Sequence, residues 1–300
     1  MKAQDLFDQI TDQLVADIQS GAPNWRMPWH TVADAATPTN LDGRPYRGLN
    51  AMWLPLVAGQ RGWDTGVWGT YRAWQSRGAQ VRRGSTGTHV VLWKSTTDTV
   101  LMDDDTEPTE RTQLIARTYS VFAAEQVDGA DELLSRRDVA ERDTPERIAA
   151  ADAYFAALGA NLTEGGNLAA YDAKADTIRI PALAQFDTAA HYYATRAHET
   201  THWTGHADRL NRDLTGRFGD DAYAAEELVA ELGAAMWCAQ NGLTTITRAD
   251  HAAYLAGWLR ILRNDARALV TVASRAQAAV DWLNTHTGHT TTETVEEVAA

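Results

Sequence analysis

The sequence predicts an α+β protein of two domains: an N-terminal mixed domain with a small antiparallel sheet, then a mostly helical C-terminal domain. Its 300 residues exceed the usual domain size of about 150 residues. Strand-like alternation occurs in the first half, whereas helical periods dominate the second. A polar, acidic stretch between them is typical of a linker. We therefore expect domains at 1–128 and 144–285, a linker at 129–143 and a disordered tail at 286–300.

The first half begins with a predicted helix, since apolar residues follow a helical period within 5–19. Residues 25–74 contain four prolines and no clean period, which indicates loops and short elements. A charged stretch at 98–111 is expected to be the tip of a hairpin. The expected strands are 80–84, 87–93 and 112–123, the first two joined by a glycine-rich turn.

The second half is predicted to be helical around one short hairpin. The hairpin combines residues 169–172 with 177–181. Apolar residues recur at helical spacing in the remaining stretches. The expected helices are 145–158, 188–203, 222–240 and 248–284, where a break can occur in the last.

Composition restricts the classes of function. No apolar run approaches the roughly 18 residues that span a bilayer, and the N-terminus lacks the apolar core of a secretory signal. Cys238 is the single cysteine, so no internal disulfide can form. We expect a cytoplasmic protein without a membrane partner. The net charge of -13 disfavours nucleic acid overall, but residues 21–95 carry nine arginines and lysines against three aspartates, a local charge of +6.

The HETTH sequence at residues 198–202 is an HExxH motif. Residues four apart share one face of a helix, so His198 and His202 can bind one cation. Zinc accepts imidazole and, in catalytic sites, keeps three protein ligands and a water. Glu199 would lie beside that water and accept its proton as general base. The motif therefore predicts one zinc ion per chain and hydrolysis by activated water.

The third metal ligand is expected downstream. We favour Glu227 on the next predicted helix, with Glu231 one turn later orienting a ligating histidine through a hydrogen bond. Glu226 points about 100° away from Glu227 on a helix. The alternatives are Asp208, which would complete HExxHxxGxxD, then His206, Glu226 and Glu231.

Several stretches together resemble the ArdC-type antirestriction proteins of plasmids and phages. In the first half they include PNWRMPW at 23–29, PTN at 38–40, YRGLN at 46–50, WGTY at 68–71 and GAQVRRG at 78–84. In the second half they include DTIRIP at 176–181, residues 198–206 and YAAEELVAEL at 223–232. The resemblance extends from about residue 5 to residue 283.

This resemblance implies an N-terminal domain that binds single-stranded DNA and a C-terminal zincin-like metallopeptidase domain acting on an unidentified protein substrate. It also implies a role in shielding incoming DNA from restriction. Family members commonly have an apolar and a small residue between the glutamate and the second histidine, whereas Thr200 and Thr201 stand here. We expect the metal site to tolerate them.

The composition of the first half supports DNA binding independently. Single strands are held by aromatic side chains that stack on bases and by a basic groove along the phosphates. For any single tryptophan, burial in the core is the simpler interpretation. The aromatic and basic residues of the first half, taken together, are therefore stronger evidence for DNA binding than any one of them. The predicted stacking residues are Trp25, Trp29 and Tyr46, and the predicted phosphate contacts are Arg44, Arg47, Arg72, Arg77, Arg82 and Arg83.

Two functions of different classes follow. The main prediction is a DNA-associated zinc metallopeptidase with Glu199 as its base. The alternative is a DNA-shielding protein without enzymatic activity, in which the metal only stabilises the C-terminal fold.

Overall fold

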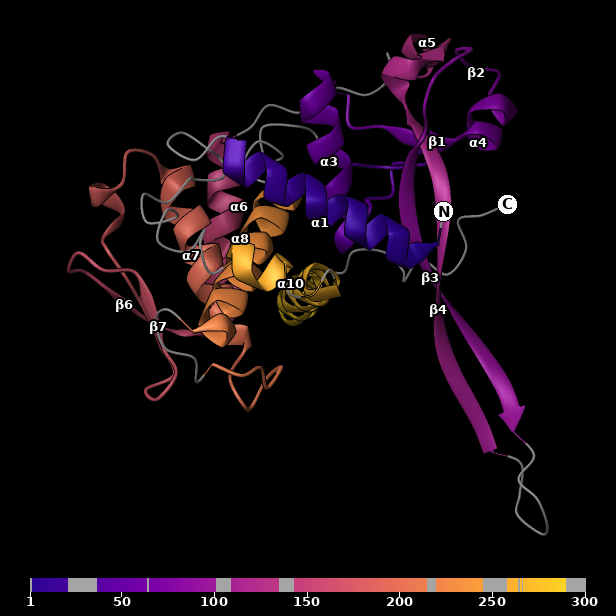
Figure 1. The fold of residues 1–300 in the computed structure, drawn as a ribbon. Coiled ribbons are helices and arrows are strands. Elements are labelled where there is room, and N and C mark those ends of the chain that lie inside the picture. The colour runs from indigo at the N-terminus through magenta and orange to yellow at the C-terminus, as the bar shows by residue number, and fades with distance from the viewer. Residues whose placement is uncertain are drawn as a thin grey trace.

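The computed structural model describes residues 2–20, 37–63, 65–100, 109–134, 143–214, 220–244, 258–263, 265 and 267–289. Trp25 and Trp29, much of the predicted linker and most of the predicted tail lie outside the described residues. An α+β fold is observed, as predicted, with antiparallel strands in the first half and helices in the second (Figure 1).

The N-terminal half combines helices with a three-stranded antiparallel sheet of order β1-β4-β3. The long strands β3 and β4 form a ribbon that projects from the body (Figure 1). The helices of the N-terminal half are α1 (Ala3–Ser20), α3 (Leu49–Arg61), α4 (Tyr71–Ser76) and α5 (Ala130–Leu134). Its strands are β1 (Trp68–Thr70), β2 (Gln80–Val81), β3 (Thr88–Val100), β4 (Thr109–Ala123) and β5 (Val127–Asp128).

Two predictions for this half were wrong. Residues 80–84 do not pair with the strand that follows; β2 pairs instead with β5, because Val81 and Val127 share a small separate core with Trp74. The region predicted to be irregular contains α3, with Pro55 inside it. This helix is buried on most sides, so its sequence shows no amphipathic period.

The C-terminal half consists of helices and a small mixed sheet of order β6-β8-β7. The predicted hairpin is observed as β7 (Ala170–Asp172) with β8 (Thr177–Ile180). The sequence did not predict β6 (Asn161–Glu164), a largely exposed strand parallel to β8. The helices are α6 (Pro145–Ala157), α7 (Ala189–Thr204), α8 (Asp221–Asn241) and α10 (Arg267–His286). Residues 258–263 are also helical.

The two halves share one hydrophobic core. Leu6 of α1 and Trp53 of α3 belong to the same buried cluster as Leu228 of α8 and Leu283 of α10. Helices α1 and α3 both contact α10 (Figure 1). Part of the predicted linker is helical, as α5, and Asp143 at its end bonds to Thr244. The α7–α8 pair is therefore supported from both halves of the chain.

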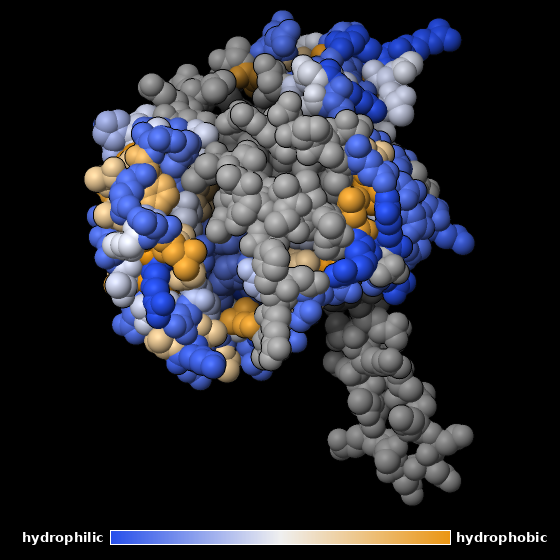
Figure 2. Space-filling model, turned by 60° about the vertical axis from the view of Figure 1, so that its left-hand side comes forward, coloured by the Kyte–Doolittle hydropathy of each residue, from blue (hydrophilic) through white to orange (hydrophobic). Residues whose placement is uncertain are grey.

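No helix among the described residues is long and apolar enough to cross a membrane. On the described part of the face shown in Figure 2, apolar side chains lie in small separate groups among hydrophilic ones.

Candidate metal centre

The HExxH motif lies in the last two turns of α7. This helix begins after Thr188, whose side chain caps it by accepting a hydrogen bond from the backbone of His191, and it ends at Gly205. The rings of His198 and His202 lie on one face, with centroids 4.9 Å apart. Both histidines and Glu199 are largely or fully buried, and the two histidines contact glutamates of α8.

Glu227 of α8 lies between the two imidazoles. Its Oε2 is 3.6 Å from His198 Nε2 and its Oε1 is 3.6 Å from His202 Nε2. Ligands of a tetrahedral zinc ion, with bonds of about 2.0–2.1 Å, lie about 3.3–3.4 Å apart. One ligand atom from each of the three residues falls within 4.8 Å of the others. The three side chains therefore fit a zinc ion after small adjustments.

Two further carboxylates of α8 hold the opposite edges of the imidazoles. His198 Nδ1 is 3.5 Å from Glu231 Oε1, and His202 Nδ1 is 3.2 Å from Glu226 Oε1. A carboxylate on one ring nitrogen fixes the orientation of the ring and leaves the other nitrogen for a metal. Both Nε2 atoms consequently point toward Glu227.

The other candidates for the third ligand do not face the two Nε2 atoms: Glu226 and Glu231 contact the Nδ1 atoms instead. Among the described residues, the group suited to a metal is His198, His202 and Glu227. Asp208 is largely exposed and pairs with His206, outside this group. Glu226 accepts two hydrogen bonds from Arg212, which commits its oxygens.

The electrostatics of the site favour charged carboxylates. Burial opposes ionisation of Glu227, but its close contact with His198 and the nearby charge of His202 hold its pKa at about 2. Burial also opposes protonation of His202, yet its hydrogen bond with Glu226 and neighbouring carboxylates raise its pKa to about 9. Burial works against the charge of Glu226 too, whereas His202 and Arg212 lower its pKa. A cation at this site would compete with protons on the imidazoles.

A cavity of about 300 Å³ opens in front of the two histidines. Its opposite wall includes Ala170 and Tyr171 of β7, and Glu199 and Tyr223 also line it. Tyr171 is fixed by Asp176, which Arg209 in turn holds by two hydrogen bonds. The metal-binding group thus faces a space into which a ligand can enter.

The unusual pair Thr200-Thr201 is accommodated between the helices. Thr201 is fully buried and donates to the backbone oxygen of Ala197 at 2.8 Å. Opposite it on α8 stands Gly233, where an added Cβ would lie 2.7 Å from Thr201 Cγ2. The larger side chain on α7 is therefore matched by a residue without a side chain on α8.

Sequence reasoning missed Arg212, which follows α7 and reads as an ordinary solvated residue. Its side chain is only 5% exposed and pairs with Glu226. Gly205, which makes room for it, was the available signal: an added Cβ there would lie 3.0 Å from Arg212 Nη2.

The predicted DNA contacts fall into two groups. Arg44, Arg72 and Arg83 are exposed and make no ion pair with any residue that the structure describes. The other predicted phosphate contacts are engaged with the protein: Arg47 with Asp281, Arg77 with Asp42, and Arg82 with Asp128 and the backbone of Glu125.

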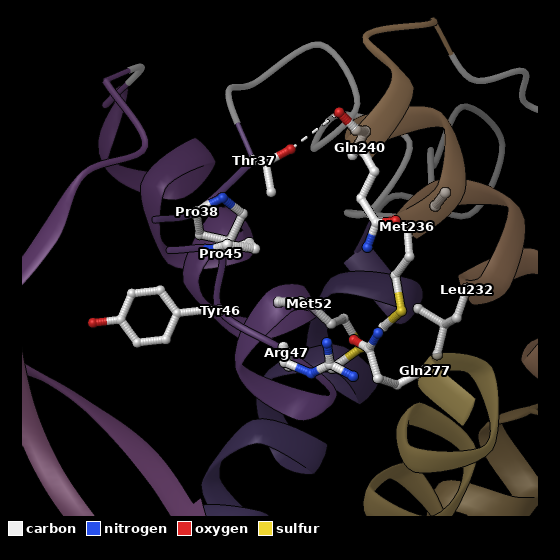
Figure 3. A pocket seen from close by; sticks show the side chains of 13 residues that line it. Thr37, Pro38, Pro45, Tyr46, Arg47, Met52, Leu232, Met236, Gln240 and Gln277 are labelled. Carbon is white, nitrogen blue, oxygen red and sulfur yellow. Dashed lines mark hydrogen bonds between the residues drawn. The ribbon is translucent and has the colours of Figure 1, made fainter. Parts of the chain in front are cut away.

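Tyr46 and Arg47 lie at the junction of the two halves. They line a cavity of about 30 Å³ between α3 and α8, together with Met52 and Met236 (Figure 3). Figure 3 shows the Tyr46 ring pointing away from Met236. Burial raises the pKa of the Tyr46 hydroxyl. Gln277 of α10 accepts a hydrogen bond from the backbone of Gly48.

Each half of the chain matches a known protein family. Residues 4–122 match the N-terminal domain of anti-restriction factor ArdC, and residues 149–275 match a zincin-like metallopeptidase family. An uncharacterized protein, y4eC, of Sinorhizobium fredii is 42% identical over 287 residues, which cover 93% of this chain and 92% of that protein. The DNA primase TraC of Escherichia coli is 32% identical over 92% of this chain, which spans only 27% of TraC.

Two solved structures share the fold. The metal-free crystal structure of the antirestriction protein ArdC from plasmid R388 has a TM-score of 0.76 and 39% identity, covering 95% of this chain and 98% of that one. The Mn(II)-bound structure of the same protein has a TM-score of 0.72 and 38% identity, over 94% and 97% of the two chains. These matches, over nearly the whole length, show that the chain belongs to the ArdC family of antirestriction proteins.

Proposed function

We propose that the C-terminal half is a zinc metallopeptidase, with one zinc ion per chain held by His198, His202 and Glu227. The observation that carries this proposal is the convergence of one ligand atom from each residue within 4.8 Å, beside a cavity. Nitrogen and carboxylate ligands in this number suit zinc in a catalytic site. The Mn(II)-bound ArdC structure supports a divalent cation here.

Zinc at this position would polarise a substrate carbonyl and acidify a water molecule. Glu199, which lines the same cavity, would accept the proton of the attacking water and pass it to the leaving amine. Strand β7 forms one edge of its sheet and lines the cavity through Ala170 and Tyr171. An extended peptide can hydrogen-bond to such an edge, which favours a peptide as the substrate.

Two variants test the roles within this site. Glu199→Gln should retain zinc but lose turnover, whereas His202→Ala should lose both. His206→Ala is the matched control, because His206 lies outside the group of ligands and should keep wild-type zinc content. Zinc is measured by atomic emission after dialysis, and turnover on an unfolded protein substrate such as casein. Zinc binding unchanged in His202→Ala would contradict the proposed ligand set.

We propose that the N-terminal half binds single-stranded DNA and shields incoming DNA from restriction. Arg72 and Arg83 are exposed, and so is the ring of Tyr71, the residue next to Arg72 in the chain; arginines contact phosphates and aromatic rings stack on bases. The combined variant Arg72→Glu and Arg83→Glu should bind a fluorescent oligonucleotide more weakly and with a smaller salt dependence. Arg275→Glu, at an exposed position on α10, is the control.

A protein that shields DNA without hydrolysing anything is the second candidate. It is supported by the shared core, through which the metal centre can stabilise the whole fold. The discriminating variant is Glu199→Gln, which keeps the zinc ligands. If this variant protects DNA from a restriction nuclease as well as wild type does, while the Arg72 and Arg83 variant does not, the shielding function needs no peptidase.

A further inference from the structure

Arg212 is a buried cation that contacts the candidate metal centre through one carboxylate. Its Nη2 donates to Glu226 Oε1 at 2.8 Å and its Nε donates to Glu226 Oε2 at 3.0 Å. Both side chains are less than a tenth exposed. Such a two-point pair fixes direction as well as distance, which a lysine could not reproduce.

The other side of the guanidinium is anchored at the end of α7. Arg212 Nη1 donates to Thr204 Oγ1 at 2.8 Å, and Nη2 donates to the backbone oxygen of Thr201 at 2.6 Å. Carbonyl groups in the last turn of a helix lack backbone partners within the helix and carry partial negative charge; the Thr201 oxygen also accepts a hydrogen bond from the Thr204 hydroxyl. Arg212 therefore joins the C-terminal end of α7 to Glu226 of α8.

The chain makes space for this guanidinium at Gly205. The backbone of Gly205 has φ -76°, which any residue adopts, so its conformation does not require glycine. An added Cβ would instead lie 3.0 Å from Arg212 Nη2 and 2.9 Å from Leu214 Cδ2. The same Cβ would lie 3.0 Å from the backbone oxygen of His202, so a side chain at this position would crowd the guanidinium and the end of α7 together.

Glu226 also contacts a predicted metal ligand, His202. Glu226 Oε1, which accepts from Arg212, is also 3.2 Å from His202 Nδ1. This contact sets the tilt of the imidazole and leaves its Nε2 facing Glu227. Glu199, Glu227 and Glu231 add further carboxylates nearby, so a cation behind Glu226 also limits the accumulation of negative charge.

We propose that Arg212 is a positioning residue of the metal centre: it holds Glu226 against His202 Nδ1 and so orients His202 for the metal. The proposal rests on the metal site proposed above. Loss of an outer hydrogen-bond partner typically weakens metal binding about 10–100-fold. We expect a loss of this size for Arg212→Met, and a smaller loss for Arg212→Lys, which keeps the charge but not the fork.

Zinc affinity is measured directly, by competition with a chromophoric chelator, and the geometry by the visible spectrum of the cobalt-loaded protein. Both should change in the Arg212 variants, with a shift of the cobalt bands that a merely structural role would not produce. Arg209→Met is the matched control. Arg209 is a buried arginine of the same segment, but it pairs with Asp176 and Tyr171 rather than with a carboxylate that touches a predicted ligand.

A double-mutant cycle with Glu226→Gln tests the route of the effect. If Arg212 acts through Glu226, Arg212→Met should lower zinc affinity much less in the Glu226→Gln background than in wild type. Equal losses in both backgrounds would overturn the proposal, as would wild-type affinity and cobalt spectra in the Arg212 variants. If Arg212→Met does not fold, Arg212→Lys takes its place in the same cycle, and equal losses of zinc affinity in both backgrounds again overturn the proposal.

The two proposals fail in different ways. Wild-type protein that binds no zinc or cobalt refutes the proposed metal site itself. If wild-type protein binds zinc and its Arg212 variants bind zinc with the same affinity, only the role of Arg212 is refuted.

Discussion

Replacing Gly233 with alanine tests how closely α7 and α8 pack behind the two histidines. The added Cβ would lie 2.7 Å from Thr201 Cγ2 and 2.8 Å from Thr201 Oγ1. Thr201 cannot easily move, because it is fully buried and its hydroxyl donates to the backbone oxygen of Ala197. The helices must separate, or Thr201 must leave its rotamer.

Two opposing effects determine the magnitude. Overpacking a core costs about 1–3 kcal/mol, whereas alanine inside a helix is favoured over glycine by about 1 kcal/mol. Gly233→Ala should therefore lower the free energy of unfolding by up to about 2 kcal/mol in wild type. In the Thr201→Ala background the two shortest contacts are absent and a contact of 3.3 Å with the Cβ of residue 201 remains, so the same change should raise the free energy of unfolding by up to about 1 kcal/mol. The predicted coupling between the two positions is about 1–3 kcal/mol.

Urea unfolding of the two single variants, the double variant and wild type, all in EDTA, measures this coupling without a contribution from metal binding. Gly59→Ala on α3 is the matched control, because its added Cβ meets no atom within 4 Å and its effect should be the same in both backgrounds. If Gly233→Ala changes the free energy of unfolding equally in the wild-type and Thr201→Ala backgrounds, the steric argument is refuted.

Three further predictions concern stability. The buried hydroxyl of Thr200 has no hydrogen-bond partner among the described residues, so Thr200→Val should raise the unfolding free energy by about 1 kcal/mol in urea titrations; a decrease would contradict this. Zinc at about 100 times its dissociation constant should raise the free energy of unfolding by about 2.7 kcal/mol. This is measured as an increase in the melting temperature, which EDTA and His202→Ala should abolish. Hydrogen bonds from Arg209 hold the pKa of Asp176 below its usual 3.8, although burial opposes this. The stability advantage of wild type over Asp176→Asn should therefore be constant at neutral pH and decline as the pH falls through the folded pKa, below 3.8.

The fold was predictable where amphipathic periods or turn residues mark an element. The helix that carries HExxH was located almost to the residue, since Thr188 caps its start and Gly205 its end. The buried helix α3 gave no such period, because a helix covered on most sides has no polar face to reveal its repeat. The pairing of β2 with β5 depends on a small core assembled from distant residues, which no local pattern contains.

The proposed metal ligands on α7 follow from helical spacing alone, but the proposed ligand on α8 does not. Glu226 and Glu227 are neighbours of identical chemistry, and either could be turned toward the histidines. What separates them is Arg212, which occupies both oxygens of Glu226 and leaves Glu227 facing both Nε2 atoms. The preference for Glu227 depends on a tertiary contact that the sequence does not disclose.

The N-terminal arginines show why charge in a sequence does not by itself define a binding surface. Arg47 is paired with Asp281 of α10, so it links the two halves and is not available to a phosphate without breaking that link. Arg72 and Arg83 of the same half are exposed. Binding DNA through Arg47 would cost the ion pair to Asp281, whereas binding through the exposed pair would cost only hydration. The exposed pair is therefore the better place to seek the DNA contact, and loss of binding in an Arg47 variant alone should be checked first against the unfolding free energy.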